Sequence, residues 1–201
     1  MLVIIVDREV NAMHRIMALL LAVLVPAVFL SARELEGVKL PDTVTVGQSV
    51  LTLNGMGVRI KKVAFIKVKV YVAGLYLPAA STDASRILAT DEPRQLVMHF
   101  VHSEVAREKL VDAWIEGFGK NAGDKMKLLA SRRDKFNSFW TDMRAGDLAV
   151  LTYVPGVGTR VEIKGAVAGV IEGKEFAEAL FSIWLGSSPP NEELKKGLLG
   201  L

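Results

Sequence analysis

The most constraining feature of this chain is the alternation of apolar and polar residues between positions 54 and 77. From residue 66 to residue 72 every even position is apolar, whereas the odd positions include Lys67, Lys69 and Tyr71. A period of two residues is typical of a β-strand with one apolar face and one polar face. The pattern therefore predicts a long strand that ends near residue 77.

The polar face of this predicted strand holds the best candidates for binding a ligand. We interpret residues 54–57 as a turn, after which Arg59 heads the strand. If the strand runs unbroken, Arg59 shares a face with Tyr71, and Lys69 is a weaker candidate on that face. A guanidinium and a phenol above one sheet face can hold an anionic or carbonyl-bearing ligand. The alternative is a solvated sheet face that carries lysines without a binding role.

The N-terminal region is similar to a secretory signal peptide. A short basic region precedes the apolar run 16–30, and Ser31-Ala32 offers small residues for cleavage. The run is shorter than the ~18–20 residues that span a bilayer. We therefore expect a cleaved leader over residues 1–32, with Met13 as a candidate true start, and a periplasmic or otherwise exported protein. The alternative is a retained N-terminal membrane anchor.

Length and composition restrict the remaining chain, residues 33–201, to one domain without cysteine chemistry. The sequence has 201 residues and no cysteine, which excludes disulfides, thiolate metal sites and a cysteine nucleophile. The net charge is +3, and no basic cluster interleaved with aromatic residues is present, so we expect no nucleic-acid partner. His99 and His102 lie three apart on a predicted strand and point to opposite faces. We expect neither a metal nor another cofactor.

The order of predicted elements indicates an α+β fold. Strand patterns cover residues 41–53, 54–77, 94–102, 148–154, 159–164 and 166–171. Helical patterns cover residues 81–88 (capped by Ser81 or Thr82), 103–118 (capped by Ser103), 124–129, 136–143, 174–185 and 191–199. Adjacent hairpins favour antiparallel pairing, and strands that alternate in blocks with helices favour a sheet covered by helices on one face.

Two longer stretches carry a resemblance to a known family. The first joins Arg59 to Gly74-Leu-Tyr-Leu77 across an apolar strand, and the second is the apolar helix 171–186 with its continuation to Gly200. These stretches resemble the chalcone isomerase family, in particular its bacterial exported branch. The resemblance covers about residue 38 to the C-terminus. It implies an open-faced β-sandwich, with a large antiparallel sheet, helices over one face and a ligand cleft between them.

The resemblance also implies roles for individual residues. In the family's enzymes an arginine holds the substrate phenolate, and a threonine–tyrosine–water network polarises the ketone. In noncatalytic relatives the arginine reaches the carboxylate of a fatty acid. The arginine corresponds to Arg59 and the threonine to Tyr71, whereas the catalytic tyrosine corresponds to Val105, which has no hydroxyl. Further departures from the enzyme pattern fall at Asp112 and near Ala177 or Glu178.

These observations lead to one prediction and two alternatives. Losing one oxyanion donor commonly costs ~10²–10³ in rate, so we do not expect efficient chalcone cyclisation. We predict binding of a small amphipathic anion, a fatty acid or flavonoid-like acid, by Arg59, Tyr71 and, more weakly, Lys69. One alternative is an isomerase (intramolecular lyase) with an altered substrate, whose hydroxyls come from Tyr71 and Tyr76. The other is a structural or partner-binding envelope protein. We expect membrane contact only through an uncleaved leader.

Overall fold

The structure is a computed structural model that describes residues 32–201. The predicted leader, residues 1–32, lies outside the described residues except for Ala32. Within residues 32–201 no helix is both long enough and apolar enough to cross a membrane.

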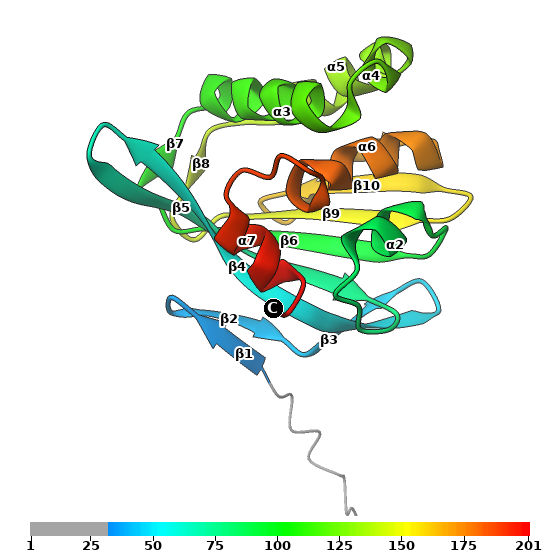
Figure 1. Cartoon of the computed structure of the whole chain (residues 1–201), viewed down its shortest axis with the longest axis horizontal. Helices are drawn as coiled ribbons and strands as arrows, with labels where there is room; N and C mark the ends of the chain where they lie inside the picture. The colour runs from blue at the N-terminus through cyan, green and yellow to red at the C-terminus, as the bar shows by residue number, and fades with distance from the viewer. Residues whose placement is uncertain (1–31) are drawn as a thin grey trace, which may run out of the picture. The chain divides into compact units, whose positions relative to one another are not determined.

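An antiparallel sheet of seven strands forms the centre of the described fold (Figure 1). Its strand order is β11-β10-β9-β6-β5-β4-β3. The strands are β3 (Thr43–Val46), β4 (Ser49–Val63), β5 (Ile66–Leu77), β6 (Arg94–Phe100), β9 (Leu148–Val154), β10 (Gly158–Ile163) and β11 (Ala166–Ile171). Two two-stranded sheets are separate from it. One is the hairpin of β1 (Ala32–Leu35) and β2 (Val38–Pro41), and the other pairs β7 (Glu104–Val105) with β8 (Met143–Arg144), which lie on either side of a run of helices in the sequence.

The helices lie over one face of this sheet (Figure 1). They are α2 (Ala84–Ala89), α3 (Arg107–Ala122), α4 (Lys125–Leu128), α5 (Ala130–Ser138), α6 (Lys174–Leu185) and α7 (Glu192–Leu198). The main core lies between the two layers and is centred on α6, whose Phe176 and Trp184 are fully buried. The predicted fold, an open-faced β-sandwich with helices on one face, is confirmed.

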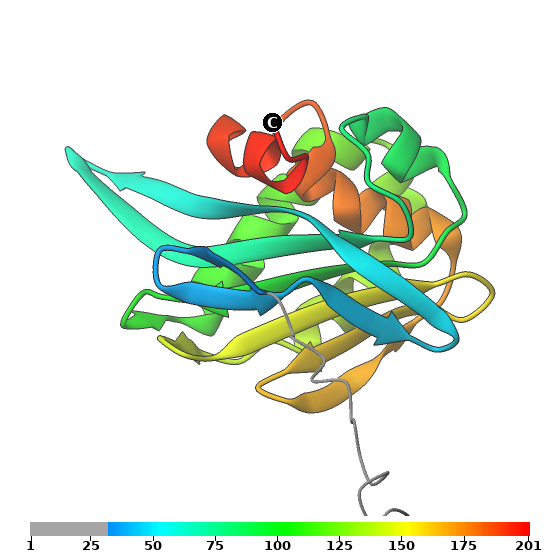
Figure 2. The same ribbon diagram turned by 90° about the horizontal axis from the view of Figure 1, so that it is seen from below.

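The opposite face of the sheet carries the β1–β2 hairpin (Figure 2). Val38 and Leu40 of β2 pack there against Val72 and Tyr76 of the sheet and form a second, smaller core. Because side chains alternate along a strand, residues of β5 that face this hairpin cannot also face the helices.

The single long strand predicted between residues 54 and 77 is in fact a hairpin. β4 and β5 pair antiparallel and are joined by a two-residue turn, Ala64-Phe65, with Ala64 at a φ of 53°. Residues 54–57, which were predicted to form a turn, belong to strand β4 instead. Its glycines serve close packing: a Cβ at Gly57 would lie 2.5 Å from the carbonyl oxygen of Leu194 in α7.

A β-bulge in this hairpin changes which side chains face the helices. Arg59 pairs with Tyr71, but the next residue of β4 pairs with Lys69, so Val70 is an extra residue in β5. A one-residue shift exchanges the two faces of a strand. Val68 and Val70 face the helix side before the bulge, and Tyr71 faces it afterwards.

Three helices begin several residues away from their predicted positions. The helix predicted over residues 136–143 is α5, which begins at Ala130 and ends at Ser138, because Met143 belongs to strand β8. The N-cap of α2 is Asp83, whose carboxylate accepts from the backbone N–H of Arg86, rather than Ser81 or Thr82. Helix α3 begins at Arg107 rather than after Ser103, because Glu104 and Val105 form strand β7 and pair with β8. The last long helix, in contrast, has the predicted bounds, residues 174–185.

Candidate functional site

A cavity of about 440 Å³ lies between the β4–β5 hairpin, helix α3 and the connection from α6 to α7. This volume falls within the range of about 300–1,000 Å³ that is usual for small-molecule sites. The bulge described above supplies the sheet side of the cavity with Val70 and Tyr71 in succession. Leu110 and Trp114 of α3 line it from the helix layer, and Pro190 closes one side.

Arg59 and Tyr71 meet at this cavity. They are directly paired across β4 and β5, and both line it, although the unbroken strand from which their shared face was predicted is in fact a hairpin. The Nη1 of Arg59 donates to the carbonyl oxygens of Ile60 and Pro190, at 2.7 Å and 2.9 Å. Among residues 32–201, nothing accepts from its Nε or Nη2 and no carboxylate forms an ion pair with it. These donors remain available to an anion.

The hydroxyl of Tyr71 is a neutral hydrogen-bond donor at the same place. Burial raises the pKa of Tyr71 to about 12, although the Trp184 hydrogen bond and the charge of Arg59 act in the opposite direction. The indole Nε1 of Trp184 donates to the hydroxyl oxygen at 2.9 Å. The hydroxyl hydrogen itself has no acceptor within the described part of the chain. Tyr71 can therefore donate to a ligand oxygen beside Arg59.

Charged side chains around the cavity have a positive excess. Four cationic and two anionic side chains line it: Arg59, Lys61, Lys109 and Lys120, with Glu104 and Glu116. Lys120 pairs with Glu116 at 2.6 Å, and its hydrogen bond lowers the pKa of that carboxyl, so Glu116 stays ionised. A cavity with excess positive charge attracts anions.

The rest of the cavity surface is largely apolar. It includes Val68 and Val70 from β5, Leu110 and Trp114 from α3, and Ile183 from α6. Trp114 in turn packs on Trp184, with ring centroids 5.5 Å apart, so the aromatic core supports this surface. A site with a guanidinium beside apolar walls fits a ligand that has an anionic head and an apolar body.

Two residues from the sequence-based hypotheses lie elsewhere. Lys69 does not line the cavity, because the bulge turns it to the opposite face, where its Nζ pairs with Glu36 at 2.6 Å. The prediction that Lys69 shares a face with Tyr71 was therefore wrong. Tyr76 also faces the β1–β2 side, and its hydroxyl donates to the carbonyl oxygen of Pro41 at 2.9 Å. It cannot join a hydroxyl network with Tyr71.

The positions that correspond to other enzyme residues are divided between cavity and core. Val105 lines the cavity but offers no hydroxyl. Asp112 is exposed on α3, Ala177 is fully buried in the main core, and neither these nor Glu178 lines the cavity. Of these positions, only Val105 lines the cavity together with Arg59 and Tyr71, and it brings no hydroxyl.

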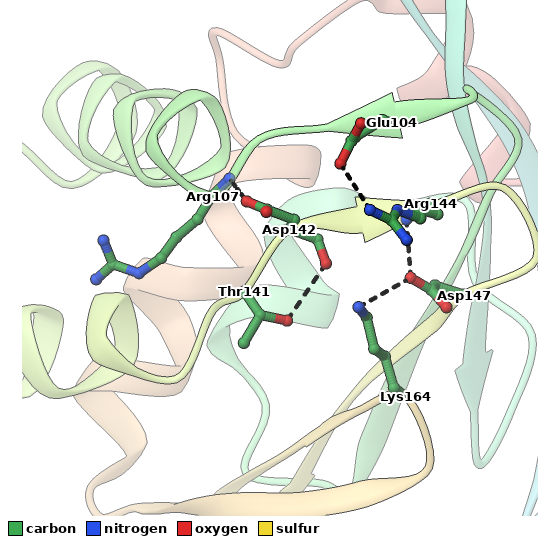
Figure 3. Close-up of polar contacts among 7 residues, drawn as sticks. All are labelled: Glu104, Arg107, Thr141, Asp142, Arg144, Asp147 and Lys164. Atoms are coloured by element: carbon green, nitrogen blue, oxygen red, sulfur yellow. Dashed lines mark hydrogen bonds and ion pairs between the residues drawn. The ribbon is translucent and has the colours of Figure 1, made fainter.

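A polar network holds the start of α3 and the strand β7 that borders the cavity (Figure 3). Glu104 pairs with Arg144 at 3.3 Å across β7 and β8. The Asp147 carboxylate accepts from the backbone N–H of Arg144 at 2.8 Å and pairs with Lys164 at 3.2 Å. The carboxylate of Asp142 accepts from the first N–H of α3, at Arg107, at 2.9 Å. These contacts fix the edge of the cavity formed by residues 104–106.

Two features of the site were not found by sequence reasoning. Trp184 fits the apolar stripe of α6, but its position beside the Tyr71 hydroxyl depends on how the helix crosses the sheet. Pro190 fixes Arg59 through its carbonyl, and no sequence pattern indicates that contact. His102 lines the cavity, and within residues 32–201 no three metal-ligating side chains are grouped together.

Comparison with known proteins agrees with this fold. A family model described as chalcone isomerase-like matches residues 32–200. The crystal structure of a fatty-acid binding protein of Arabidopsis thaliana matches with a TM-score of 0.64 and 19% sequence identity, covering 84% of this chain and 96% of that chain. No curated protein matches the sequence significantly. At 19% identity the structural likeness shows the fold alone.

Proposed function

Because the chain belongs to the chalcone isomerase-like family, we propose that it binds a small amphipathic anion in the cavity beside the β4–β5 hairpin. The observation that carries the proposal is the pairing of Arg59 and Tyr71 at one cavity, each with donors left for a ligand. A fatty acid is the ligand class we favour. The structural relative named above is a fatty-acid binding protein, which supports this choice.

Binding follows from the chemistry of the two ends of the ligand. A carboxylate accepts from the unpaired nitrogens of Arg59 and from the hydroxyl of Tyr71. Hydrogen bonds to charged groups contribute about 1.5–3 kcal/mol each. The alkyl chain lies against Val70, Leu110 and Trp114, where each buried methylene contributes about 0.8 kcal/mol.

Binding is favoured over the two alternative functions by particular observations. A chalcone-type cyclisation needs a network of groups that polarise a ketone. Tyr71 supplies one hydroxyl beside Arg59, but Val105 has no hydroxyl and Tyr76 faces away from the cavity. A purely structural role would fit a cleft filled by the protein's own side chains, whereas this one leaves about 440 Å³.

The test is calorimetric titration of dodecanoate and of a flavonoid-like acid into wild type, Arg59→Ala and Lys69→Ala. Lys69 is the matched control, because it is a cation of the same hairpin on the opposite face. We expect Arg59→Ala to weaken binding about 10–100-fold, since it removes at least one charged hydrogen bond. We expect Lys69→Ala to bind like wild type. Unchanged affinity in Arg59→Ala for both acids would contradict the proposal.

Two further measurements separate the alternatives. Arg59→Lys keeps the charge but not the planar fork, so an intermediate affinity shows recognition of the head group rather than a disturbed Pro190 loop. Turnover of a chalcone above its spontaneous rate, lost in Arg59→Ala, would favour the isomerase instead. Mass spectrometry of small molecules that copurify with the protein identifies the natural ligand.

We also propose that the protein is exported. The support is the apolar run at residues 16–30 followed by small residues, together with a family match that begins at residue 32. Intact-mass measurement of the protein recovered from the cell envelope tests this. A mass that begins near Arg33 is expected, and a full-length protein confined to the cytoplasm would contradict it.

A further inference from the structure

The end of the β4–β5 hairpin projects beyond the neighbouring strands (Figures 1 and 2). Its apolar side chains are exposed. We define the hairpin tip as residues 61–67. Phe65 in the turn is 104% exposed, and Val63 and Ile66, which pair across the turn, are 53% and 68% exposed. Single exposed apolar residues are common on proteins, but three that adjoin at one projection mark an interaction surface.

Lysines surround this apolar group on both strands. Lys61 and Lys62 precede it and Lys67 follows it, and all three are exposed. Lys62 and Lys67 are directly paired across the hairpin, although like charges in that position repel each other. No carboxylate of residues 32–201 forms an ion pair with any of the three, and the sequence has no acidic residue between Asp42 and Asp83.

We propose that the hairpin tip docks on the surface of an anionic lipid bilayer. Apolar side chains with adjacent lysines match the boundary between acyl chains and negatively charged headgroups. Phe65, Val63 and Ile66 enter the headgroup region, and the lysines contact lipid phosphates. Because these side chains are already exposed, docking requires no rearrangement of the core.

Docking also places the cavity at the membrane. Lys61 and Val63 belong to the hairpin tip and line the cavity, and Val68 adjoins both. An amphipathic anion that leaves the bilayer therefore meets the cavity next to the docked tip. This exchange of ligand with the membrane rests on the proposed binding function, whereas docking itself does not.

The first experiment measures cosedimentation with phosphatidylcholine vesicles that contain or lack phosphatidylglycerol. It uses residues 32–201, which form a compact unit with its own core, beside the full chain. We expect binding to the anionic vesicles only. Phe65→Ser with Ile66→Ser should weaken it about tenfold or more, as expected from the apolar area withdrawn. Lys62→Glu with Lys67→Glu should also weaken it about tenfold or more.

A matched control lies on α4, where Leu128 is 89% exposed and directly follows Lys127. Leu128→Ser with Lys127→Glu changes the same residue types away from the hairpin. This variant should bind vesicles like wild type. Equal losses in the α4 variant and the hairpin variants, or no binding by wild type, would overturn the proposal.

The second experiment reads the tip directly in the full chain. Phe65→Trp adds an indole at the most exposed position, and its emission should shift to shorter wavelength with anionic vesicles and be quenched by brominated lipid. Unchanged emission would overturn docking by the tip, whatever the leader does. Dimerisation in sedimentation velocity that Phe65→Ser removes, without vesicle binding, would assign the tip to a second copy of the chain instead.

The two proposals fail separately. Phe65 and Ile66 do not line the cavity, so Phe65→Ser with Ile66→Ser should keep the wild-type affinity for dodecanoate. Tip-dependent vesicle binding by a protein that binds no dodecanoate would leave docking intact and contradict the proposed function. Dodecanoate binding without vesicle binding would leave the proposed function intact and contradict docking.

Discussion

Trp184 donates its indole N–H to the hydroxyl of Tyr71 at 2.9 Å, and this contact joins helix α6 to strand β5 beside the cavity. Both side chains are almost completely buried. The contact fixes the position of the phenol ring. It occupies an acceptor site of the hydroxyl oxygen, so the hydroxyl hydrogen points elsewhere. The same hydrogen bond therefore contributes to both stability and ligand recognition.

We predict that Tyr71→Phe lowers the free energy of unfolding by about 1–3 kcal/mol, because it leaves the buried Trp184 N–H without an acceptor. Urea denaturation measures this loss. In the variant that combines Tyr71→Phe with Trp184→Phe, both polar partners are absent, so the loss should be smaller than the sum of the single losses. Additive losses would show that the hydrogen bond contributes nothing.

Stability should fall at high pH because all three tyrosines are buried. Burial is the main reason why the pKa of each of Tyr71, Tyr76 and Tyr153 is raised from 10.0 to about 12. In the unfolded chain tyrosine loses its proton near pH 10. The stabilisation is therefore fully present below about pH 10 and is lost as the pH rises toward 12. Urea midpoints across this window, together with phenolate absorbance, measure the effect.

Two results would contradict this alkaline prediction. One is a urea midpoint that does not change as the pH rises through the window. The other is phenolate absorbance that appears near pH 10 while the protein is still folded. Either result would mean that the phenols are accessible to water in the native state.

Asp147 should stabilise the edge of the cavity through its charge. The backbone N–H of Arg144 and, next, Lys164 lower the pKa of this carboxyl. A lowered pKa means that the stabilisation is present above the unfolded pKa of about 3.9 and is lost as the pH falls through the folded value. Asp147→Asn keeps the acceptor but removes the charge, so we expect a loss on the order of 0.5–1 kcal/mol at neutral pH.

Thermal unfolding of Asp147→Asn at neutral and acidic pH checks this. The difference from wild type should disappear at acidic pH. Asp124→Asn is the control. Asp124 also pairs with a lysine, Lys127, but the Asp124 side chain is 91% exposed. This variant should change stability little at any pH. Equal effects in the two variants would contradict a specific role for Asp147.

Gly57 should be required for the contact between β4 and α7. An added Cβ would lie 2.5 Å from the carbonyl oxygen of Leu194, which is backbone and cannot move aside alone. We expect Gly57→Ala to lower the free energy of unfolding by about 1–3 kcal/mol through overpacking. Since α7 follows Pro190, which accepts from Arg59, ligand affinity should fall as well.

Gly119→Ala is the matched control for this substitution. Gly119 lies within α3, and a Cβ there meets no atom within 4 Å. Alanine is favoured over glycine in a helix by roughly 0.5–1 kcal/mol, so this variant should gain stability. Urea denaturation of both variants should thus give changes of opposite sign. A loss in both would show that α3 does not accept the added methyl group.

A local sequence pattern was sufficient to predict an element when the pattern lies entirely within that element. Helix 174–185 has an apolar stripe that can pack on any sheet face, and its predicted bounds are those of α6. The hairpin at 148–164 is marked by Pro155-Gly156 and follows the prediction closely. The β4–β5 turn was missed because Ala64-Phe65 carries no glycine, proline or asparagine, so no turn signal separates the two strands.

The sequence by itself determined the family and the sheet covered by helices, and it marked Arg59 as a candidate ligand contact. These depend on residue types and on periods that hold along the chain. The tertiary structure alone decided that Tyr71 faces the cavity and Lys69 does not, because one extra residue in β5 exchanges the faces. It also decided the partners of the site, Trp184 and Pro190, which lie more than 100 residues from β4 and β5. A bulge and a helix crossing depend on packing between distant segments, and no pattern within either segment records them.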